Sequence, residues 1–223
     1  MTGPQSTTTE VLAVTAPDGT PPCVIDMARA VAAVLHARVR TLSHTERWLD
    51  ELAAPRVALA VLSRGPGLDW AQVSSAPKPI ILVPDRRPEG RPGLRRVLVP
   101  LNGTTESASA IETTVGLFAL RGVEVVLLHI FDAATVPRFW DQTTHASETW
   151  QNEFLARFWT HPKVRLEMRS GIAHEHVLTE SVAQHVDLIA LAWSQKLGSG
   201  HAQTVRRTVL DSDVPVMLVP IAT

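Results

Sequence analysis

The segment VPLNGTTES in the middle of the chain has residue types that suit a phosphate-binding joint. Apolar residues lead to Pro100 and Leu101, the chain turns at Asn102 and Gly103, and hydroxyl and acidic residues follow, as at the start of a helix. Parallel sheets bind ligands at the carboxyl ends of their strands, and free backbone N–H groups at the start of a helix attract phosphate. The segment therefore predicts an anion or nucleotide pocket whose floor is Pro100, Leu101 and Asn102.

Two later segments would complete such a pocket. The apolar strand 123–131 would place His129 and Ile130 at its wall, and a phosphate-binding loop would follow the apolar strand 187–194. Phosphate-binding loops use glycine so that backbone N–H groups can approach phosphate closely. The candidate cofactor-binding residues are Pro100, Leu101, Asn102, Ile130, Ala192, Gly198, Gly200 and Thr204.

The sequence Gly198-Ser199-Gly200-His201 leaves two interpretations of that loop open. Two glycines and a serine would form an anion-binding nest in a shifted register, to which His201 adds charge when it is protonated. The simpler interpretation is a flexible turn that leads into the last helix, since motifs of this length often arise by chance.

Other histidines are candidates for catalysis or metal binding. His129 lies within an apolar strand and no orienting partner is evident, so a core or strand-end role is favoured over catalysis. His174 and His176 are two positions apart on an expected helix, which directs their rings to different faces and disfavours a shared metal. His145 and His161 stand elsewhere in the chain, and we expect no metal site.

Three further features have a packing interpretation. Cys23, near a helix start, is interpreted as a core residue rather than an activated thiolate, and Asp187 is expected to cap the turn before a buried strand. Trp150, Phe154 and Phe158 fall four apart, which indicates a helix packed on the sheet, with a partner-binding groove as the alternative. The sequence shows no Ser-His-Asp order, paired carboxylates or metal-ligand cluster, so we predict no enzymatic reaction.

Composition excludes several classes of protein. The 223 residues are 45% hydrophobic and 19% charged, which is typical of a globular chain with a sizeable core. The formal net charge of -1 gives no support for binding nucleic acid or an anionic membrane. Cys23 is the only cysteine, and the first ten residues lack the pattern of a signal peptide, so a cytoplasmic location is expected.

The two halves of the chain repeat one order of strands and helices. Apolar strands that alternate with helices predict a parallel sheet covered on both faces. The segment KPIILVP at 78–84 matches VPVMLVP at 214–220 almost residue for residue. The first half is shorter and lacks room for one βα step. The expected strands are 11–17, 38–43, 56–64, 78–84, 96–101, 123–131, 163–171, 187–194 and 214–220.

We predict three parts: a degenerate N-terminal unit at 1–84, a linker at 85–94, and a C-terminal domain at 95–223. The linker is rich in Pro, Gly and Arg and offers almost nothing to bury. The fold class is α/β, with two tandem doubly wound parallel-sheet units of which the first is trimmed. We expect two separate sheets that face each other as a pseudo-dimer, with the last strands, 79–84 and 215–220, near the pseudo-twofold axis.

The second half resembles the universal stress protein family over 95–220. VLVPLNGTTESASAI is similar to that family's first strand and helix, and VVLLHIF to its second strand. GIAHEHVLTESVAQHVDLIALAW and TVRRTVLDSDVPVMLVP are similar to its closing helices and strands. The resemblance implies a flavodoxin-like open sheet, a cytoplasmic protein, pairing of two such units and, in some members, ATP binding.

The sequence departs from the pattern of the family's ATP-binding members, Gly-x-x-Gly, nine residues, then Gly-Ser/Thr. The positions that the resemblance implies for glycine hold Ala192, Gln195 and Gln203. Thr204 keeps the hydroxyl, but the loop is shorter than the family's spacing and Trp193 adds bulk. Asn102 stands where the family usually has Asp, which removes a charge that would hold ribose or a metal.

These observations predict a non-enzymatic stress-response protein of the universal stress family, which acts through protein contacts or a ligand other than ATP. The alternative is an ATP-binding sensor with a remodelled phosphate loop. A third class, an adenylyl-transferring enzyme, would need an intact phosphate loop. No cofactor is expected, and the partners expected are the two halves as an intrachain pseudo-dimer, a second copy in a homodimer, or an unknown protein.

Overall fold

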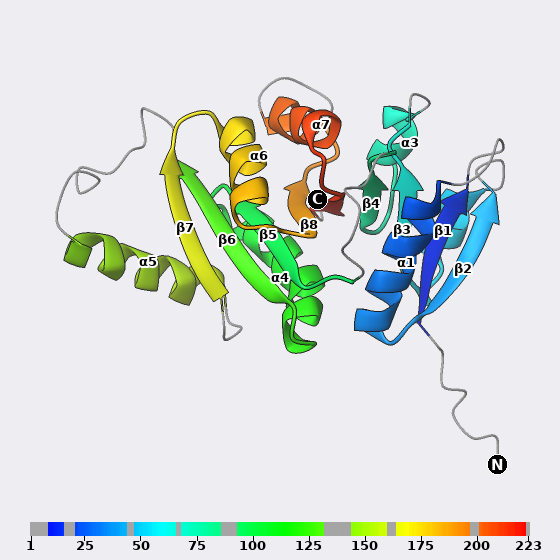
Figure 1. The fold of residues 1–223 in the computed structure, drawn as a ribbon, viewed down its shortest axis with the longest axis horizontal. Helices are drawn as coiled ribbons and strands as arrows, with labels where there is room; N and C mark the ends of the chain where they lie inside the picture. Colours follow the sequence, from blue (N-terminus) through cyan, green and yellow to red (C-terminus); the bar gives the residue numbers. More distant parts are fainter. Residues whose placement is uncertain are drawn as a thin grey trace, which may run out of the picture.

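The computed structural model describes residues 9–15, 21–43, 47–65, 68–85, 93–131, 144–159, 164–196 and 201–221 (Figure 1). The first half contains β1 (Glu10–Thr15), α1 (Pro22–Leu35), β2 (Arg38–Ser43), α2 (Trp48–Ala53), β3 (Val57–Ser63), α3 (Trp70–Ser74) and β4 (Ile80–Val83). The second half contains β5 (Arg96–Leu101), α4 (Thr105–Leu120), β6 (Glu124–Phe131), α5 (Thr144–Phe158), β7 (Val164–Ser170), α6 (Ala173–Ala183), β8 (Leu188–Trp193), α7 (His201–Asp211) and β9 (Val216–Pro220).

The described strands form one sheet of nine, in the order β2-β1-β3-β4-β9-β8-β5-β6-β7. Neighbouring strands are parallel within each half, as expected. The expectation of two separate sheets is wrong, because β4 and β9 pair antiparallel and join the halves. Ile80 lies opposite Leu218 and Leu82 opposite Val216. Each last strand therefore pairs with backbone groups that would otherwise be exposed at the edge of the other half's sheet. The last strands therefore meet at the centre of the molecule, where they were expected (Figure 1).

The first half is trimmed as predicted. It contributes four strands to the described sheet and the second half five. In the second half β7 continues the sheet beyond β6, whereas in the first half β2 is the outermost strand. Strand order reverses between β5 and β8 in the second half, and ligands bind at such reversals in open parallel sheets.

Helices cover both faces of the sheet, because alternate strand residues point to opposite sides and both sets are apolar. One buried cluster contains Val24 of α1, Ile111 of α4 and Phe154 of α5. The other contains Trp48 of α2, Val73 of α3, Val177 of α6 and Val205 of α7. This arrangement confirms the doubly wound α/β class predicted from the sequence. None of the helices in the described segments has both the length and the apolar character needed to span a membrane.

The boundary between the halves stays a prediction. Most of the expected linker, 86–92, and the first eight residues of the chain lie outside the described residues. Leu94, the last residue of the expected linker, is buried in the core on the face that α1 and α4 cover. The packed part of the second half therefore begins at least one residue earlier than composition indicated.

Candidate functional site

The joint between β5 and α4 forms the turn that the sequence predicted. The exposed Asn102 accepts hydrogen bonds at Oδ1 from the backbone N–H of Thr104 (3.1 Å) and from its hydroxyl (2.9 Å). Thr104 in turn caps α4 by accepting from the N–H of Ser107 at 3.3 Å. Gly103 has φ +78°, a conformation that glycine adopts without steric cost. The Asn102 side chain thus stabilises its own turn.

The candidate floor and part of the wall come together. Leu101 is buried, Pro100 is half-buried, and the Leu101 carbonyl lies 2.9 Å from Nδ1 of His129 on β6. Alternation along β6 places Ile130 on the opposite face of the sheet from His129. The floor therefore has His129 beside it, while Ile130 contributes to the core on the other side.

The His129 ring is a packing group in an aromatic cluster. Its centroid lies 4.5 Å from that of Phe131, 5.4 Å from Trp150 and 5.0 Å from Phe154. Burial lowers the pKa of His129, and this outweighs the opposing effect of the bond to the Leu101 carbonyl. A neutral ring with its proton on Nδ1 donates that bond. The core or strand-end interpretation of His129 is confirmed.

The aromatic stripe packs as predicted. Phe154 is 5% exposed and stacks on the half-buried Trp150 at a centroid distance of 5.0 Å. Both rings contact His129 at the end of β6. The side chain of Phe158 lies outside the described residues.

The end of β8 is occupied by contacts with the first half. Trp193, which is 2% exposed, meets Trp70 of α3 edge to face with ring centroids 6.1 Å apart. Gln195 has φ +62°, the left-handed conformation that favours glycine. Its Nε2 donates to the carbonyl of Ala76 in the first half at 2.7 Å. Gln195, at a position that the resemblance implies for glycine, therefore has a backbone conformation that favours glycine. Its side chain forms a hydrogen bond between this loop and the first half.

Helix α7, which follows this loop, also contacts the first half, from its middle and from its C-terminal end. The guanidinium of Arg206 lies 5.3 Å from the ring centroid of Trp70. Nη1 of Arg64, just after β3, donates to the carbonyls of Val209 and Ser212, both at 2.5 Å. These carbonyls end α7, where positive charge is favourable.

The remaining candidates of the phosphate loop are only partly described. Ala192 is 5% exposed, and Thr204 is half-buried within α7. Gly198 and Gly200 lie outside the described residues, as does the side chain of His201. The anion-nest hypothesis therefore stays a prediction.

Sequence reasoning missed Trp70, Ala76 and Arg64 as partners of the β8–α7 segment. The bulk of Trp193 and the glutamine at 195 were visible in the sequence. Their partners were not, because Ala76 is 119 positions from Gln195 and Arg64 is 145 positions from Val209. No local pattern signals a contact across such a separation.

The other histidines have separate partners. Nε2 of His174 lies 3.4 Å from Nη1 of Arg207, and Nε2 of His176 lies 2.9 Å from the Ser170 carbonyl. The expectation that the two rings point apart is confirmed. The described residues contain no group of three His, Cys, Asp or Glu side chains placed to hold a metal.

The Asp187 side chain bonds to the start of β5, which corrects the expectation that it caps the turn before β8. The side chain is 7% exposed, and Oδ2 accepts from the backbone N–H groups of Arg95 (2.8 Å) and Arg96 (3.1 Å). Asp187 thus fixes the start of β8 to the start of β5. Cys23 is buried as expected, with Sγ donating to the Pro84 carbonyl at 3.5 Å.

Comparison with known proteins agrees with this fold. The model of the universal stress protein family matches residues 93–220, more than half of the 223-residue chain. The protein belongs to the universal stress protein family. A search of curated protein sequences found no match.

Two solved structures cover nearly the whole chain, including the first half. A functionally unknown protein from Pseudomonas aeruginosa PAO1 has a TM-score of 0.65 at 13% identity, over 95% of this chain and 92% of its own. A universal stress protein from Archaeoglobus fulgidus has a TM-score of 0.55 at 14% identity, over 96% of this chain and 85% of its own. At such identities the likeness shows the fold, and it supports a tandem arrangement of two related units.

Proposed function

We propose that this protein is a non-enzymatic stress-response protein that acts through protein contacts or a ligand other than ATP. The main support for this proposal is that the segment between β8 and α7 contacts the first half of the chain. Gln195 bonds to Ala76 and Trp193 packs on Trp70, in the segment where an ATP-binding member would present glycines to phosphate.

Two further observations support weak affinity for nucleotide at this edge. Asn102 carries no charge for a metal, and its Oδ1 already accepts two hydrogen bonds from Thr104. Ala192 and Gln203 add side chains where backbone N–H groups would have to close on phosphate. The start of α4 still offers N–H groups, so a weak anion site is compatible with the proposal.

The alternative is an ATP-binding sensor in which the segment of Gly198 and Gly200 has taken over the phosphates. Titration calorimetry of the full chain with Mg-ATP separates the two. We expect no saturable binding tighter than about 10 μM, or about -7 kcal/mol. Tighter binding would establish the sensor and overturn the proposal.

Variants that put back the family's residues test whether ATP binding can be restored. Asn102→Asp alone is expected to leave binding unchanged, because the glycine positions stay filled. The triple change that adds Ala192→Gly and Gln203→Gly removes two of the obstructing side chains and is expected to bind better than Asn102→Asp. Equal binding by the single and the triple variant would show that these side chains are not what excludes ATP.

We propose that the two halves act as an intrachain pseudo-dimer, supported by the antiparallel pairing of β4 with β9. The protein partner is then a further molecule, with a homodimer as the simplest case. Light scattering after size exclusion gives 24.3 kDa for a single chain and twice that mass for a homodimer. A cytoplasmic location follows from family membership as part of this proposal, and localisation of a tagged chain tests it.

A further inference from the structure

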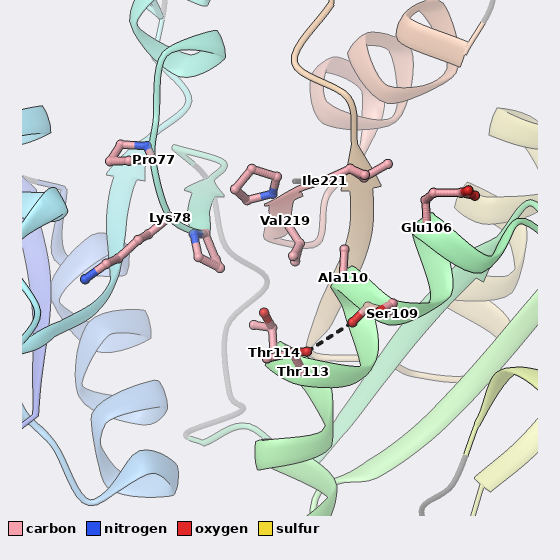
Figure 2. Close-up of a pocket in the computed structure, with 11 residues that line it drawn as sticks. Pro77, Lys78, Glu106, Ser109, Ala110, Thr113, Thr114, Val219 and Ile221 are labelled. Atoms are coloured by element: carbon pink, nitrogen blue, oxygen red, sulfur yellow. Dashed lines mark hydrogen bonds between the residues drawn. The ribbon is translucent and has the colours of Figure 1, made fainter. Parts of the chain in front are cut away.

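A groove of about 400 Å³ lies where the two halves meet (Figure 2). Its walls are Pro77–Pro79 before β4, the face of α4 from Glu106 to Thr114, and Val219–Ile221 at the end of β9. The volume lies within the range of small-molecule sites. None of the candidate cofactor-binding residues that the structure describes at the β5–β8 edge lines it, so the groove is separate from that edge.

Proline explains why the groove exists. The antiparallel ladder between β4 and β9 ends at the pair Ile80 and Leu218. Continuation of the same register would bring Lys78 opposite Pro220. Pro220 has no backbone N–H, and neither does Pro79, so the ladder cannot continue in its normal pattern. The strand ends leave a gap instead of pairing.

This interruption leaves the backbone groups of Lys78 and the carbonyl of Pro220 without ladder partners. Ile221 donates its N–H to the Trp193 carbonyl at 2.9 Å, so its backbone groups face β8. Because backbone groups alternate along a strand, the Pro220 carbonyl faces the first half. In the described part of the chain, neither this carbonyl nor the N–H of Lys78 has a hydrogen-bond partner. A primary amide carries the complementary acceptor and donor.

The charges around the groove disfavour an anion. The charged end of the Lys78 side chain points away from the groove, because Nζ donates to the carbonyls of Ala54 and Val57, both at 2.6 Å (Figure 2). Glu106 stands at the opposite rim and has no ion pair in the described residues. Between them, α4 presents the neutral hydroxyls of Ser109, Thr113 and Thr114.

We propose that this groove binds a small uncharged molecule that carries a carboxamide on an apolar ring. The amide pairs with the Lys78 N–H and the Pro220 carbonyl. The ring packs against the pyrrolidine of Pro79 and the methyl group of Ala110, which both line the groove. This assignment does not depend on whether ATP binds at the β5–β8 edge.

Benzamide and benzoate test the proposal, because they share size and shape and differ in charge. Two-dimensional ¹H–¹⁵N spectra of the full chain are recorded during titration with each. We expect saturable shifts of the Lys78, Ala110 and Ile221 amide signals with benzamide, and binding of benzoate at least roughly tenfold weaker. Absence of benzamide saturation, equal affinity for benzoate, or shifts that map elsewhere each overturns the proposal.

Variants of α4 locate the site. Thr114→Trp fills the groove and is expected to weaken benzamide binding at least roughly tenfold. Thr105→Trp, on the same helix but outside the groove, is the matched control and is expected to bind as the wild type does. Thr113→Lys adds a cation to the lining and is expected to strengthen benzoate binding relative to benzamide. Failure of the lysine variant to change this ratio would overturn the assignment even if Thr114→Trp did not fold.

Discussion

The ring of Trp193, at the end of β8, meets the ring of Trp70 in α3 edge to face, 123 positions away along the chain, with centroids 6.1 Å apart. One residue belongs to each half. The guanidinium of Arg206 lies over the Trp70 ring, 5.3 Å from its centroid. The segment where the family's phosphate loop would begin is thus part of the contact between the halves, and the stability of that contact can be measured.

A double-mutant cycle measures the Trp70–Trp193 contact. Trp70→Ala, Trp193→Ala and the double variant are unfolded in urea, with far-ultraviolet circular dichroism as the signal. Edge-to-face aromatic pairs contribute about 0.5–1.5 kcal/mol beyond burial, so we expect a coupling free energy of that size. Effects that add within about 0.3 kcal/mol would show that the rings do not interact in solution.

Arg64 is expected to stabilise the contact between the halves at the C-terminal end of α7. Arg64→Met removes two charge-assisted hydrogen bonds to the carbonyls of Val209 and Ser212. We expect the free energy of unfolding to fall by about 1.5–3 kcal/mol. Arg29→Met is the control, since the Arg29 side chain is 72% exposed, and it should change stability by less than about 0.5 kcal/mol. Equal effects of the two changes would contradict the capping role.

The sequence predicted the strands well because each is a short apolar run between turn residues. The buried strands Ile80–Val83 and Val216–Pro220 were recognised, and their similarity indicated two related halves. Both strands were expected near the pseudo-twofold axis but in separate sheets, since a pattern of apolar residues shows that an edge must be covered but not that two edges join in one ladder. One continuous sheet resulted where two were expected.

The site was less predictable than the fold. The turn at Asn102 and Gly103 is local, and the residue types alone indicated it. The left-handed backbone of Gln195 is unusual for a residue with a side chain, and it is accompanied by a bond to Ala76 that only the folded chain brings into reach. The groove at Pro220 likewise depends on the β4–β9 register, because this register decides at which residue pair the prolines end the ladder.

The boundary between the halves can be tested by limited proteolysis. The segment 85–94 offers little to bury, and its Arg86–Arg87 bond is an ordinary trypsin site, whereas Arg87 and Arg91 each precede proline, so we predict that trypsin cuts first after Arg86. Mass spectrometry of the earliest fragments locates the cut. First cuts within either half would place the boundary elsewhere.

Cys23 is expected to react slowly. Burial raises the pKa of the thiol, nearby Asp85 and Asp26 raise it further, and backbone hydrogen bonds oppose these effects. The thiolate is the reactive form, so alkylation by iodoacetamide at pH 8 should be slow in the folded chain and fast in urea. Equal rates in the two conditions would mean that Cys23 is accessible and ionises as in an unfolded chain.

His129 gives the protein a pH-dependent stability with a defined sign. Burial in the aromatic cluster lowers its folded pKa below the unfolded value of about 6.5. Above pH 6.5 the ring is neutral in both states, and its contribution to stability is fully present. As the pH falls through this value the unfolded chain takes up the proton first, so this contribution is lost progressively until the pH has passed the folded pKa. His129→Gln should therefore lose less stability than the wild type between pH 7.5 and pH 5 in urea unfolding. The titration of the His129 ring by NMR is the direct measurement, and a midpoint at or above 6.5 would contradict both the sign and the assignment of His129 as a half-buried packing group.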